Sequence, residues 1–459
     1  MQPSAARASP LTMDLARRGA MLSFHELPRP VVLLARDAIM DFFAVAIAGA
    51  REPLADIVFA ELSDMGGATQ SSVIGRGVKM PAANAALLNG TAAHAHDYDD
   101  CSMALSGHPT AAILPAVLAL AERRISSGSD VMTAYVAGYE LACHIGSIIG
   151  PSSQRRGFHL TGTVGMLGAA AAAARLLGLN ACATARAIGI AASQAGGLRV
   201  EGGTMCKPLH PGRAAQGGVV AALLASRGFV ARIDILECER GFIDAYSSID
   251  PRQIGRVPDG IEQFFLESNI IKRHAACFFT HAGIECAGAV RSHPDFDIDG
   301  VTEIQLFLHP ETIRSCSVIS PANSLEARRS LPYTAAMALL GIDGAIPDFF
   351  DRVTGAQSTK LDKVRLMITL EPDPILSHTA ARITVRFRTG KMLAASRDAA
   401  DPSDHDTAWC DPLRGKFNIL VSSSLTPAQA MELHSMLDTF DLLPDISAVM
   451  TLAAGTCHS

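Results

Sequence analysis

Thiolate metal motifs and membrane-spanning runs are both absent from this sequence. Its 10 cysteines are scattered and never form the C-x-x-C spacing of zinc or iron–sulfur sites, a distribution typical of reduced thiols in the cytoplasm. No apolar run reaches the roughly 18 residues that a membrane-spanning helix needs. The N-terminal segment has scattered Arg and Ser without an apolar stretch and cleavage site, so secretion is not indicated and an organelle transit peptide stays open. We expect a cytoplasmic protein with no membrane partner.

Positive charge is also scarce. The chain has 39 Lys and Arg against 45 Asp and Glu, a formal net charge of −6. A nucleic-acid partner needs clustered Lys and Arg to neutralise phosphates, so no nucleic acid is expected. Apolar side chains, in contrast, are abundant: 49% of the 459 residues are hydrophobic and 18% are charged. This composition excludes a disordered chain, and the length predicts two or three domains.

From about residue 30 to residue 230 the sequence is typical of helices. Long Ala- and Leu-rich segments such as Val31–Ala50, Asp130–Gly150 and Gly165–Leu179 are separated by Gly, Asn and Pro. Several of these segments are apolar nearly all round, which indicates helices that are buried by other helices. The sequence therefore predicts a large helical core.

The pattern changes after about residue 270. Apolar residues alternate with others over 302–308, 363–370 and 381–387, and Thr389-Gly390 can turn the last segment into a strand over 391–395. Beyond residue 400 an Asp-rich stretch leads back to helical sequence, where Thr426 and Pro427 are typical N-cap and first-turn residues. We predict a mainly α fold, in which a large discontinuous all-helical domain (residues 1–268 and 401–459) carries a smaller inserted α+β domain (269–400).

The densest polar cluster is His94-Ala95-His96-Asp97-Tyr98-Asp99-Asp100, which lies between a predicted helix over 82–93 and Gly107-His108-Pro109. Carboxylates this close repel one another unless they are protonated, hydrogen-bonded or opposed by cations, so one of them with a raised pKa suits proton transfer. A solvated acidic turn that caps the helix starting at Pro109 is the alternative. Histidine and aspartate are also metal ligands, but this spacing is too loose to predict a metal.

Two glycine-containing segments precede predicted helices. Residues 157–163 contain His159, and glycine next to the unpaired N–H groups of a helix start suits an anion, with a capping loop and a surface histidine as the alternative. No strand precedes this segment, so it is not a dinucleotide fingerprint. In residues 202–212, Lys207 and His210 lie among glycines and prolines just before an apolar helix. This pattern suits either a carboxylate-binding loop or a solvated turn.

Further candidates come from the second half of the chain. Lys272, Arg273 and His274, followed by Cys277 and His281, place several cations at the predicted domain junction, although basic runs are usually solvated. Tyr333 begins an apolar helix, where a half-buried structural tyrosine is the common outcome. The candidate cations and histidines together suit a substrate with several carboxylates, whose negative charges need Lys, Arg or His in place of water.

The order of these motifs resembles the MmgE/PrpD family, which includes 2-methylcitrate dehydratases, cis-aconitate decarboxylases and iminodisuccinate epimerases. The resemblance extends from about residue 30 to the C-terminus and rests on HAHDYDD, GHPTAAILPAV, GFHLTGTVG, GTMCKPLHPGRAAQGG, the later Lys272, and SLPY. It implies a helical domain with a discontinuous C-terminal part, an α+β lid over a pocket, a homodimer, and no metal or other cofactor.

The resemblance also implies a set of site residues. The catalytic candidates are Asp97, His108, His159, Lys207, Lys272 and Tyr333. The substrate-binding candidates are Cys101, Arg273 and His210. Cys101 stands where the dehydratases and decarboxylases have a threonine, and Ser102 stands where a tryptophan often follows. The spacing from Asp97 to His108 and the block KPLHPGRAA are closer to the epimerase, whereas SLPY restores a tyrosine that is not expected in that branch.

Three functional hypotheses follow from these features. The first is a cofactor-independent lyase that dehydrates or decarboxylates a small di- or tricarboxylate, with lysines binding carboxylates and Asp97, His108 and His159 moving protons. The second is an epimerase at a carbon alpha to a carboxylate, which Cys101 and the epimerase-like spacing favour. The third is a carboxylate-binding dimer that has lost activity.

Overall fold

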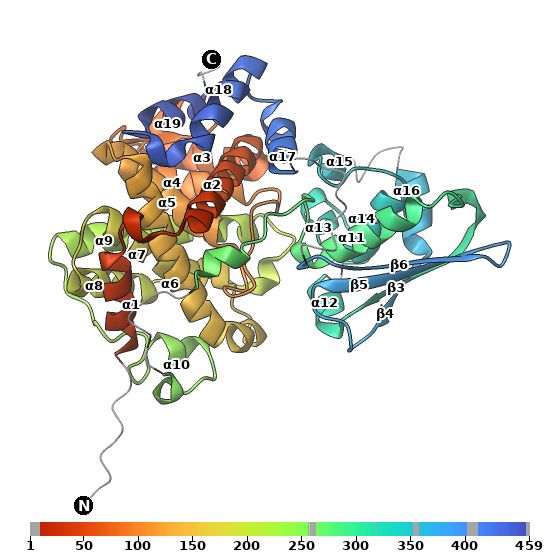
Figure 1. Cartoon of the computed structure of the whole chain (residues 1–459), viewed down its shortest axis with the longest axis horizontal. Coiled ribbons are helices and arrows are strands. Elements are labelled where there is room, and N and C mark those ends of the chain that lie inside the picture. The colour runs from red at the N-terminus through yellow and green to blue at the C-terminus, as the bar shows by residue number, and fades with distance from the viewer. Residues whose placement is uncertain are drawn as a thin grey trace, which may run out of the picture.

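The computed structural model describes residues 10–255, 257, 263–316, 318–351, 358–401 and 412–455. Over these residues the protein is mainly helical, with a small mixed sheet in the C-terminal region (Figure 1). Most of the Asp-rich stretch after residue 400 lies outside the described residues. Among the described helices, none is both long enough and apolar enough to cross a membrane.

The N-terminal part consists of helices packed on helices, with one antiparallel strand pair. Its elements are α1 (Leu11–Met21), α2 (Arg29–Gly49), α3 (Pro53–Met65), β1 (Ser71–Val73), β2 (Val78–Met80), α4 (Ala82–Ala93), α5 (Pro109–Arg124), α6 (Gly128–Arg155), α7 (Leu160–Leu176), α8 (Ala181–Ala192), α9 (Cys206–Ser226) and α10 (Phe242–Tyr246). In α5 every residue from Pro109 to Glu122 is buried, and in α7 every residue from Leu160 to Ala174. Helices buried by other helices are therefore confirmed.

Close packing of α4 against α9 brings the loop that follows α4 next to the first turn of α9. A Cβ added to Gly212 of α9 would lie 2.2 Å from the carbonyl oxygen of Leu87 in α4, so the two helix backbones touch there. The absence of a side chain at Gly212 allows this approach. As a result, the first turn of α9 lies beside the loop that leaves the C-terminal end of α4.

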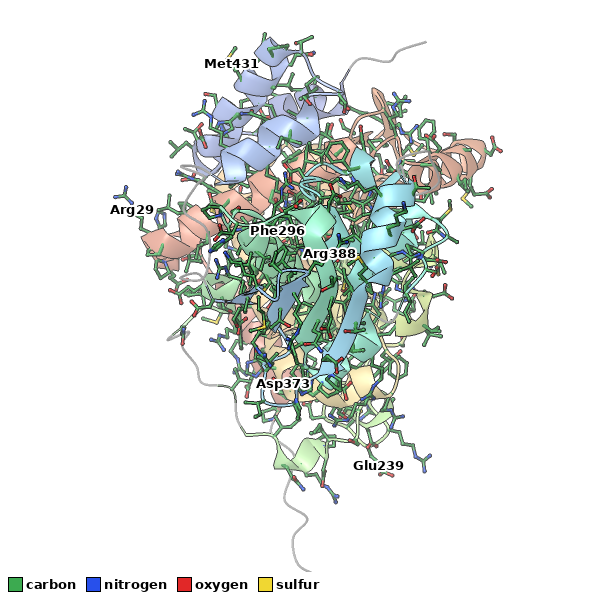
Figure 2. All side chains as sticks on the ribbon, turned by 90° about the vertical axis from the view of Figure 1, so that its right-hand side faces the viewer. Arg29, Glu239, Phe296, Asp373, Arg388 and Met431 are labelled. Atoms are coloured by element: carbon green, nitrogen blue, oxygen red, sulfur yellow. The ribbon has the colours of Figure 1, made fainter. Side chains whose placement is uncertain are left out.

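The C-terminal region contains the sheet and the helices that cover it. Its elements are α11 (Phe278–Arg291), β3 (Val301–Leu308), α12 (Pro310–Ser315), α13 (Ser324–Ala327), α14 (Leu331–Leu339), α15 (Asp348–Asp351), α16 (Ser358–Leu366), β4 (Ile368–Pro372), β5 (Ala380–Phe387) and β6 (Met392–Asp398). The strand order is β4-β3-β5-β6, with β3 parallel to β4 and antiparallel to β5. α11 packs against β5 and β6, and α14 packs on α11. In Figure 2 this region faces the viewer, with Arg388 and Asp373 in front of the helical part.

The strands at 302–308 and 381–387 are confirmed, but the strand predicted over 363–370 is wrong in its first half. Residues up to Leu366 belong to α16, and the strand begins only at Ile368. Leu361 and Val364 are buried three residues apart, which is helical spacing, whereas Leu366 is 72% exposed. A short alternating run fits the end of a helix as well as a strand, and tertiary burial decides between them.

The closing helices, α17 (Pro412–Val421), α18 (Pro427–Asp438) and α19 (Ser447–Ala454), return to the N-terminal part (Figure 1). α17 and α18 pack against α2, and α19 packs against β1. The Nζ of Lys416 in α17 lies 2.5 Å from Asp41 Oδ1 and donates to the carbonyl of Tyr98 at 2.7 Å. Thr426 caps α18 as predicted. The predicted domain limits at residues 268 and 400 stay a prediction.

Candidate functional site

A buried loop joins α4 to α5 and carries the HAHDYDD motif. Residues 94–102 are all buried, and Asp97, Asp99 and Asp100 are 7%, 2% and 1% exposed. Cys101 and Ile270 exchange two backbone hydrogen bonds of 2.9 Å, which fasten this loop to the segment that carries Lys272. Burial rules out the alternative of a solvated acidic turn.

Asp97 is the centre of the loop and pairs with two lysines. Its Oδ2 accepts a hydrogen bond from Lys207, and its Oδ1 accepts one from Lys272 Nζ at 2.6 Å. Lys272 Nζ also donates to the Asp97 carbonyl at 2.6 Å. The backbone of Asp97 has φ +51°, a conformation that is uncommon outside glycine and often found at functional sites. Three distant segments of the chain therefore meet at one carboxylate.

The charges of Asp97 and Lys272 are fixed at neutral pH. Burial alone would raise the pKa of Asp97, but Lys207 and Lys272 outweigh burial and hold the pKa well below its usual range. Burial alone would lower the pKa of Lys272, but Asp97 and Asp99 reverse this effect and raise the pKa. Asp97 is thus a permanent anion that holds two cations in place.

The neighbouring carboxyls have opposite pKa shifts. Burial would raise the pKa of Asp99, but His94, whose Nδ1 lies 2.7 Å from Asp99 Oδ1, contributes to lowering it below the usual range. Burial raises the pKa of Asp100 to about 7, and Asp99 adds to this, although a hydrogen bond from the Thr110 hydroxyl opposes it. Asp100 is therefore the carboxyl of the cluster that holds a proton near neutral pH.

His108 presents an unprotonated nitrogen toward Asp97. Its Nδ1 lies 2.9 Å from the carbonyl of Asp100, and because a carbonyl only accepts, Nδ1 carries the proton. Burial lowers the pKa of His108 well below its usual value, with Lys272 among the lesser causes. In the neutral ring Nε2 therefore has the lone pair, 3.8 Å from Asp97 Oδ1. His108 is ready to accept a proton.

His159 and His210 share a hydrogen bond. His159 is the N-cap residue of α7, and its Nδ1 lies 2.9 Å from His210 Nδ1, so one ring donates and the other accepts. Burial and then Lys207 lower the pKa of His159 well below its usual value, and burial lowers the pKa of His210 to about 4. The rings of His108 and His159 are 6.4 Å apart. Two neutral imidazoles therefore lie beside the Asp97–Lys207 pair.

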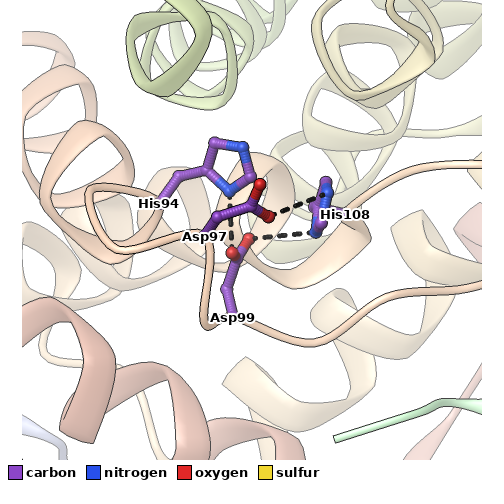
Figure 3. A group of neighbouring side chains, drawn as sticks. All are labelled: His94, Asp97, Asp99 and His108. Carbon is purple, nitrogen blue, oxygen red and sulfur yellow. Dashed lines mark hydrogen bonds and ion pairs between the residues drawn. The ribbon is translucent and has the colours of Figure 1, made fainter. Parts of the chain in front are cut away.

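Within the part of the chain that the structure describes, one group of side chains is compact enough to hold a metal ion. His94, Asp97, Asp99 and His108 each place one ligand atom within 4.8 Å of the others. Figure 3 shows these four side chains gathered close together. However, both oxygens of Asp97 already accept from ammonium groups, and a metal cation would have to displace these lysines. The donors present therefore fit an internal charge network better than a metal centre.

A cavity of about 450 Å³ opens next to these residues. Residues within 101–108, 151–159 and 198–207 line it from the N-terminal part, and residues 277–279, 315, 329 and 378 line it from the C-terminal region. Four of the predicted site residues lie on its wall: Cys101, His108, His159 and Lys207. Asp97 and Lys272 lie behind Lys207, and His210 lies behind His159.

Lys207 is not in a loop, as the sequence suggested, but in the first turn of α9. Pro208 is tolerated there because the N–H groups of a first helical turn have no partner within the helix. The side chain of Lys207 is 12% exposed, which excludes the alternative of a solvated turn. The helix start therefore sets the direction in which this lysine points.

The other two predicted residues, Tyr333 and Arg273, are also not on the cavity wall. Tyr333 is 3% exposed in the first turn of α14, with its ring 6.5 Å from that of Phe350. Arg273 offers its backbone carbonyl to the Tyr98 hydroxyl at 2.7 Å. The predicted roles of both side chains stay predictions.

The structure adds wall residues that the sequence analysis did not select. These are Arg199, which follows Gly196-Gly197, and Arg329, which directly precedes the SLPY motif. Cys277 also lines the cavity, and its Sγ lies 3.6 Å from Cys316 Sγ. The hydrogen bond from Cys316 lowers the pKa of Cys277 against the effect of burial. Arg329 adjoins the quoted SLPY motif, but Arg199 lies four residues before the GTMCKPLHPGRAAQGG motif, so neither arginine belongs to a quoted motif.

Two protein-family models match the chain: the MmgE/PrpD N-terminal domain over residues 13–254 and the MmgE/PrpD C-terminal domain over residues 274–442. The chain belongs to the MmgE/PrpD family. It is 29% identical over 404 residues to a Mus musculus protein named cis-aconitate decarboxylase, which covers 84% of this chain and 82% of the mouse protein. The Homo sapiens protein of that name is 28% identical over 392 residues, covering 82% and 80% of the two chains.

A fungal relative extends over nearly the whole length. The Aspergillus terreus cis-aconitate decarboxylase is 25% identical over 484 residues, covering 97% of this chain and 96% of its own. The resemblance read from the motif order is therefore confirmed at the level of the MmgE/PrpD family.

Proposed function

We propose that this MmgE/PrpD protein is a lyase that acts on a small tricarboxylate, with decarboxylation of cis-aconitate as the first reaction to test. The observation that carries this proposal is the Asp97–Lys207–Lys272 triad beside two neutral imidazoles at one cavity. The names of the relatives support the choice of substrate. Dehydration of a related hydroxy-tricarboxylate uses the same kinds of group and stays within the proposal.

The chemistry requires a cation and a proton donor. Loss of CO2 from cis-aconitate leaves an electron pair that is delocalised over the neighbouring double bond and its carboxylate. Addition of one proton at the far carbon then gives an unsaturated dicarboxylate. Lys207, held at the cavity by Asp97, is placed to stabilise the charge that develops on the carboxylate oxygens.

His108 and His159 are the groups that we assign to proton transfer. Their pKa values are lowered first of all by burial, so both rings are neutral in the substrate-free protein. A bound trianion favours the imidazolium form, because an opposite charge within a few ångströms raises the pKa of histidine. Substrate binding therefore favours protonation of a histidine, which supplies the proton that the reaction consumes. Asp97, with its pKa well below the usual range, positions the lysines and does not itself exchange the proton.

We also assign the cavity to the junction between a discontinuous helical domain and an α+β lid. Its wall combines residues of the N-terminal part with Cys277, Ser315 and Arg329 of the sheet region. The buried guanidinium of Arg328 donates to the carbonyls of Ala275 and Pro347, and lies 3.5 Å from that of His96. It thereby joins the sheet region to the loop that carries Asp97.

The test is turnover of cis-aconitate by the purified protein, followed by CO2 release and by NMR of the organic product, with 2-methylcitrate in a parallel assay. Lys207→Ala is expected to lower kcat/KM by about 100-fold or more, because it removes a preorganised cation. Lys391→Ala, which breaks a surface ion pair with Asp295, is the matched control and should leave kcat/KM unchanged. Full activity of Lys207→Ala would contradict the role of this lysine.

Epimerisation alpha to a carboxylate is the second candidate, because two neutral imidazoles at one cavity also suit a two-base reaction. Burial raises the pKa of Cys101, so its thiol is not a ready base at neutral pH. Deuterium incorporation into recovered substrate in D2O, without loss of CO2 or water, would favour the epimerase. Ligand binding with no turnover of any acid would favour an inactive carboxylate-binding protein.

A further inference from the structure

Two arginines from different parts of the chain meet at the cavity wall. Arg199 follows α8 and lies in the N-terminal part, and Arg329 lies between α13 and α14. Arg199 Nη2 lies 3.2 Å from Ser315 Oγ, and Arg329 Nη2 donates to the Ser315 carbonyl at 2.6 Å. Both guanidinium groups therefore contact one residue at the end of α12, on the surface of the same cavity.

Neither arginine has a carboxylate partner among the described residues. The acids whose fields reach them are already neutralised: Glu311 pairs with Arg314 at 2.7 Å, and Asp97 pairs with Lys207 and Lys272. The pKa of Arg199 is lowered, first by burial and then by Arg329. Ionisation of Cys277 would supply one negative charge against two positive ones. The wall therefore carries uncompensated positive charge that an anion would neutralise.

The surrounding backbone holds both side chains in place. The N–H of Arg199 donates to the Gly157 carbonyl at 2.9 Å, and the N–H of His159 donates to the Gly197 carbonyl at 3.0 Å, so Arg199 and His159 lie on paired segments. A Cβ at Gly202 would lie 1.9 Å from Arg329 Nη1, so glycine at this position leaves room for the guanidinium. The pair is thus built into the cavity wall and is not two free surface arginines.

We infer that Arg199 and Arg329 form a second carboxylate subsite, separate from Lys207. This subsite makes the cavity selective for tricarboxylates over dicarboxylates. This inference rests on the proposed function for its substrate class. Guanidinium groups bind carboxylates with charge-assisted and often bidentate hydrogen bonds, which give stronger and more directional binding than a neutral donor. One carboxylate at the arginine pair leaves the other two for Lys207 and the histidines.

The experiment measures the binding of three saturated acids by calorimetry. Tricarballylate is the tricarboxylate; glutarate lacks its central carboxylate, and methylsuccinate lacks one of its terminal carboxylates. Arg199→Gln and Arg329→Gln are each expected to weaken tricarballylate binding about tenfold or more. The dicarboxylate that lacks the arginine-bound carboxylate should bind both variants with an affinity within about twofold of its affinity for the unaltered protein. Arg227→Gln, at an exposed position after α9, is the matched control.

Two results would overturn the subsite: unchanged tricarballylate binding in both variants, or equal weakening of all three acids. Arg329→Lys keeps the positive charge but removes the paired N–H donors of the guanidinium group, and it supports the assignment if it restores part of the selectivity. Thermal melting checks that each variant is folded. Tricarballylate has neither a double bond nor a hydroxyl group, so its binding does not depend on turnover. A protein that selects tricarballylate through both arginines but fails to convert cis-aconitate would refute the proposed reaction and retain the subsite.

Discussion

At the scale of single residues, Asp97 turns two mobile lysine side chains into fixed cations. Lys272 is almost fully buried and donates to both the carboxylate and the carbonyl of Asp97, whereas Lys207 is partly open to the cavity. Burying a charge is costly unless it is paired and hydrogen-bonded. The inner lysine therefore stabilises the carboxylate, and the outer lysine remains available to a substrate.

Removal of Lys272 should show how strongly the buried Asp97 carboxylate depends on its paired cations. We expect Lys272→Met to lower the free energy of unfolding by about 3–5 kcal/mol, because it leaves Asp97 buried with one of its two cations gone. The double variant with Asp97→Asn should be less destabilised than Lys272→Met alone, since no uncompensated carboxylate remains. Denaturant unfolding of the two single variants and the double variant gives this coupling. Strictly additive effects would contradict it.

Cys277 is predicted to be the most reactive cysteine of the cavity. The hydrogen bond from Cys316 lowers its pKa, whereas burial raises that of Cys101 on the same wall. Because the thiolate is the nucleophile, iodoacetamide at pH 7 should alkylate Cys277 faster than Cys101. Cys316→Ala should slow this alkylation several-fold, and tricarballylate should protect the thiol. Mass spectrometry of the labelled peptides provides the measurement, and preferential labelling of Cys101 would refute the assignment.

At the scale of elements, the site depends on how helix ends are brought together. α4 ends just before the Asp97 loop, α7 begins after His159, and α9 carries Lys207 in its first turn. The contact of Gly212 with the Leu87 carbonyl fixes the distance between α4 and α9. The position of the Lys207 ammonium relative to Asp97 therefore depends on backbone packing at Gly212, five residues further along α9.

Gly212→Ala tests this dependence. The added methyl group meets the Leu87 backbone, which cannot move aside as a flexible side chain would, so we expect a loss of about 1–3 kcal/mol of stability. The variant should also lose activity on the proposed substrate, because the start of α9 shifts. Gly288→Ala in α11, where a Cβ meets nothing within 4 Å, is the control and should be neutral or slightly stabilising. Equal melting temperatures for both variants would contradict the role of this contact.

The sequence predicted most elements because their patterns are long and regular. The mostly apolar helices α5 and α7 follow from long Ala- and Leu-rich segments, and the strands β3 and β5 follow from period-two alternation. The short run at 363–370 is divided between α16 and β4, which only tertiary burial decides. Motif order selected Asp97 and Lys207, but no local pattern marks Arg199 or Arg329, because their common contact at Ser315 forms only when distant segments pack.

At the scale of the whole molecule, the cavity exists because the sheet region packs against the helical part. Lys416 of α17 contacts Asp41 and the carbonyl of Tyr98, so the closing helices support the Asp97 loop from behind. Arg328 supports the same loop from the sheet region. A change in the placement of either segment would therefore reach the charged centre without touching a cavity-lining residue.

Buried and half-buried histidines make the stability of the whole protein depend on pH. Burial lowers the pKa of His210 and of His274 to about 4, and lowers those of His108, His159 and His281 well below the usual value. Below about pH 6.5 the unfolded chain binds protons at these positions and the folded protein does not, so the free energy of unfolding falls as the pH falls. Asp100 and Glu140, whose pKa values burial raises to about 7, oppose this trend, but they are fewer.

His274→Gln isolates one of these contributions. His274 is not on the cavity wall, and the replacement removes a group that takes up a proton on unfolding. Between pH 6.5 and pH 4 the slope of unfolding free energy against pH should decrease by up to about 1.4 kcal/mol per pH unit, the value for one proton. The unaltered protein provides the reference slope. Denaturant titrations across this range measure both slopes, and an unaltered slope in His274→Gln would mean that this ring already takes up its proton in the folded protein.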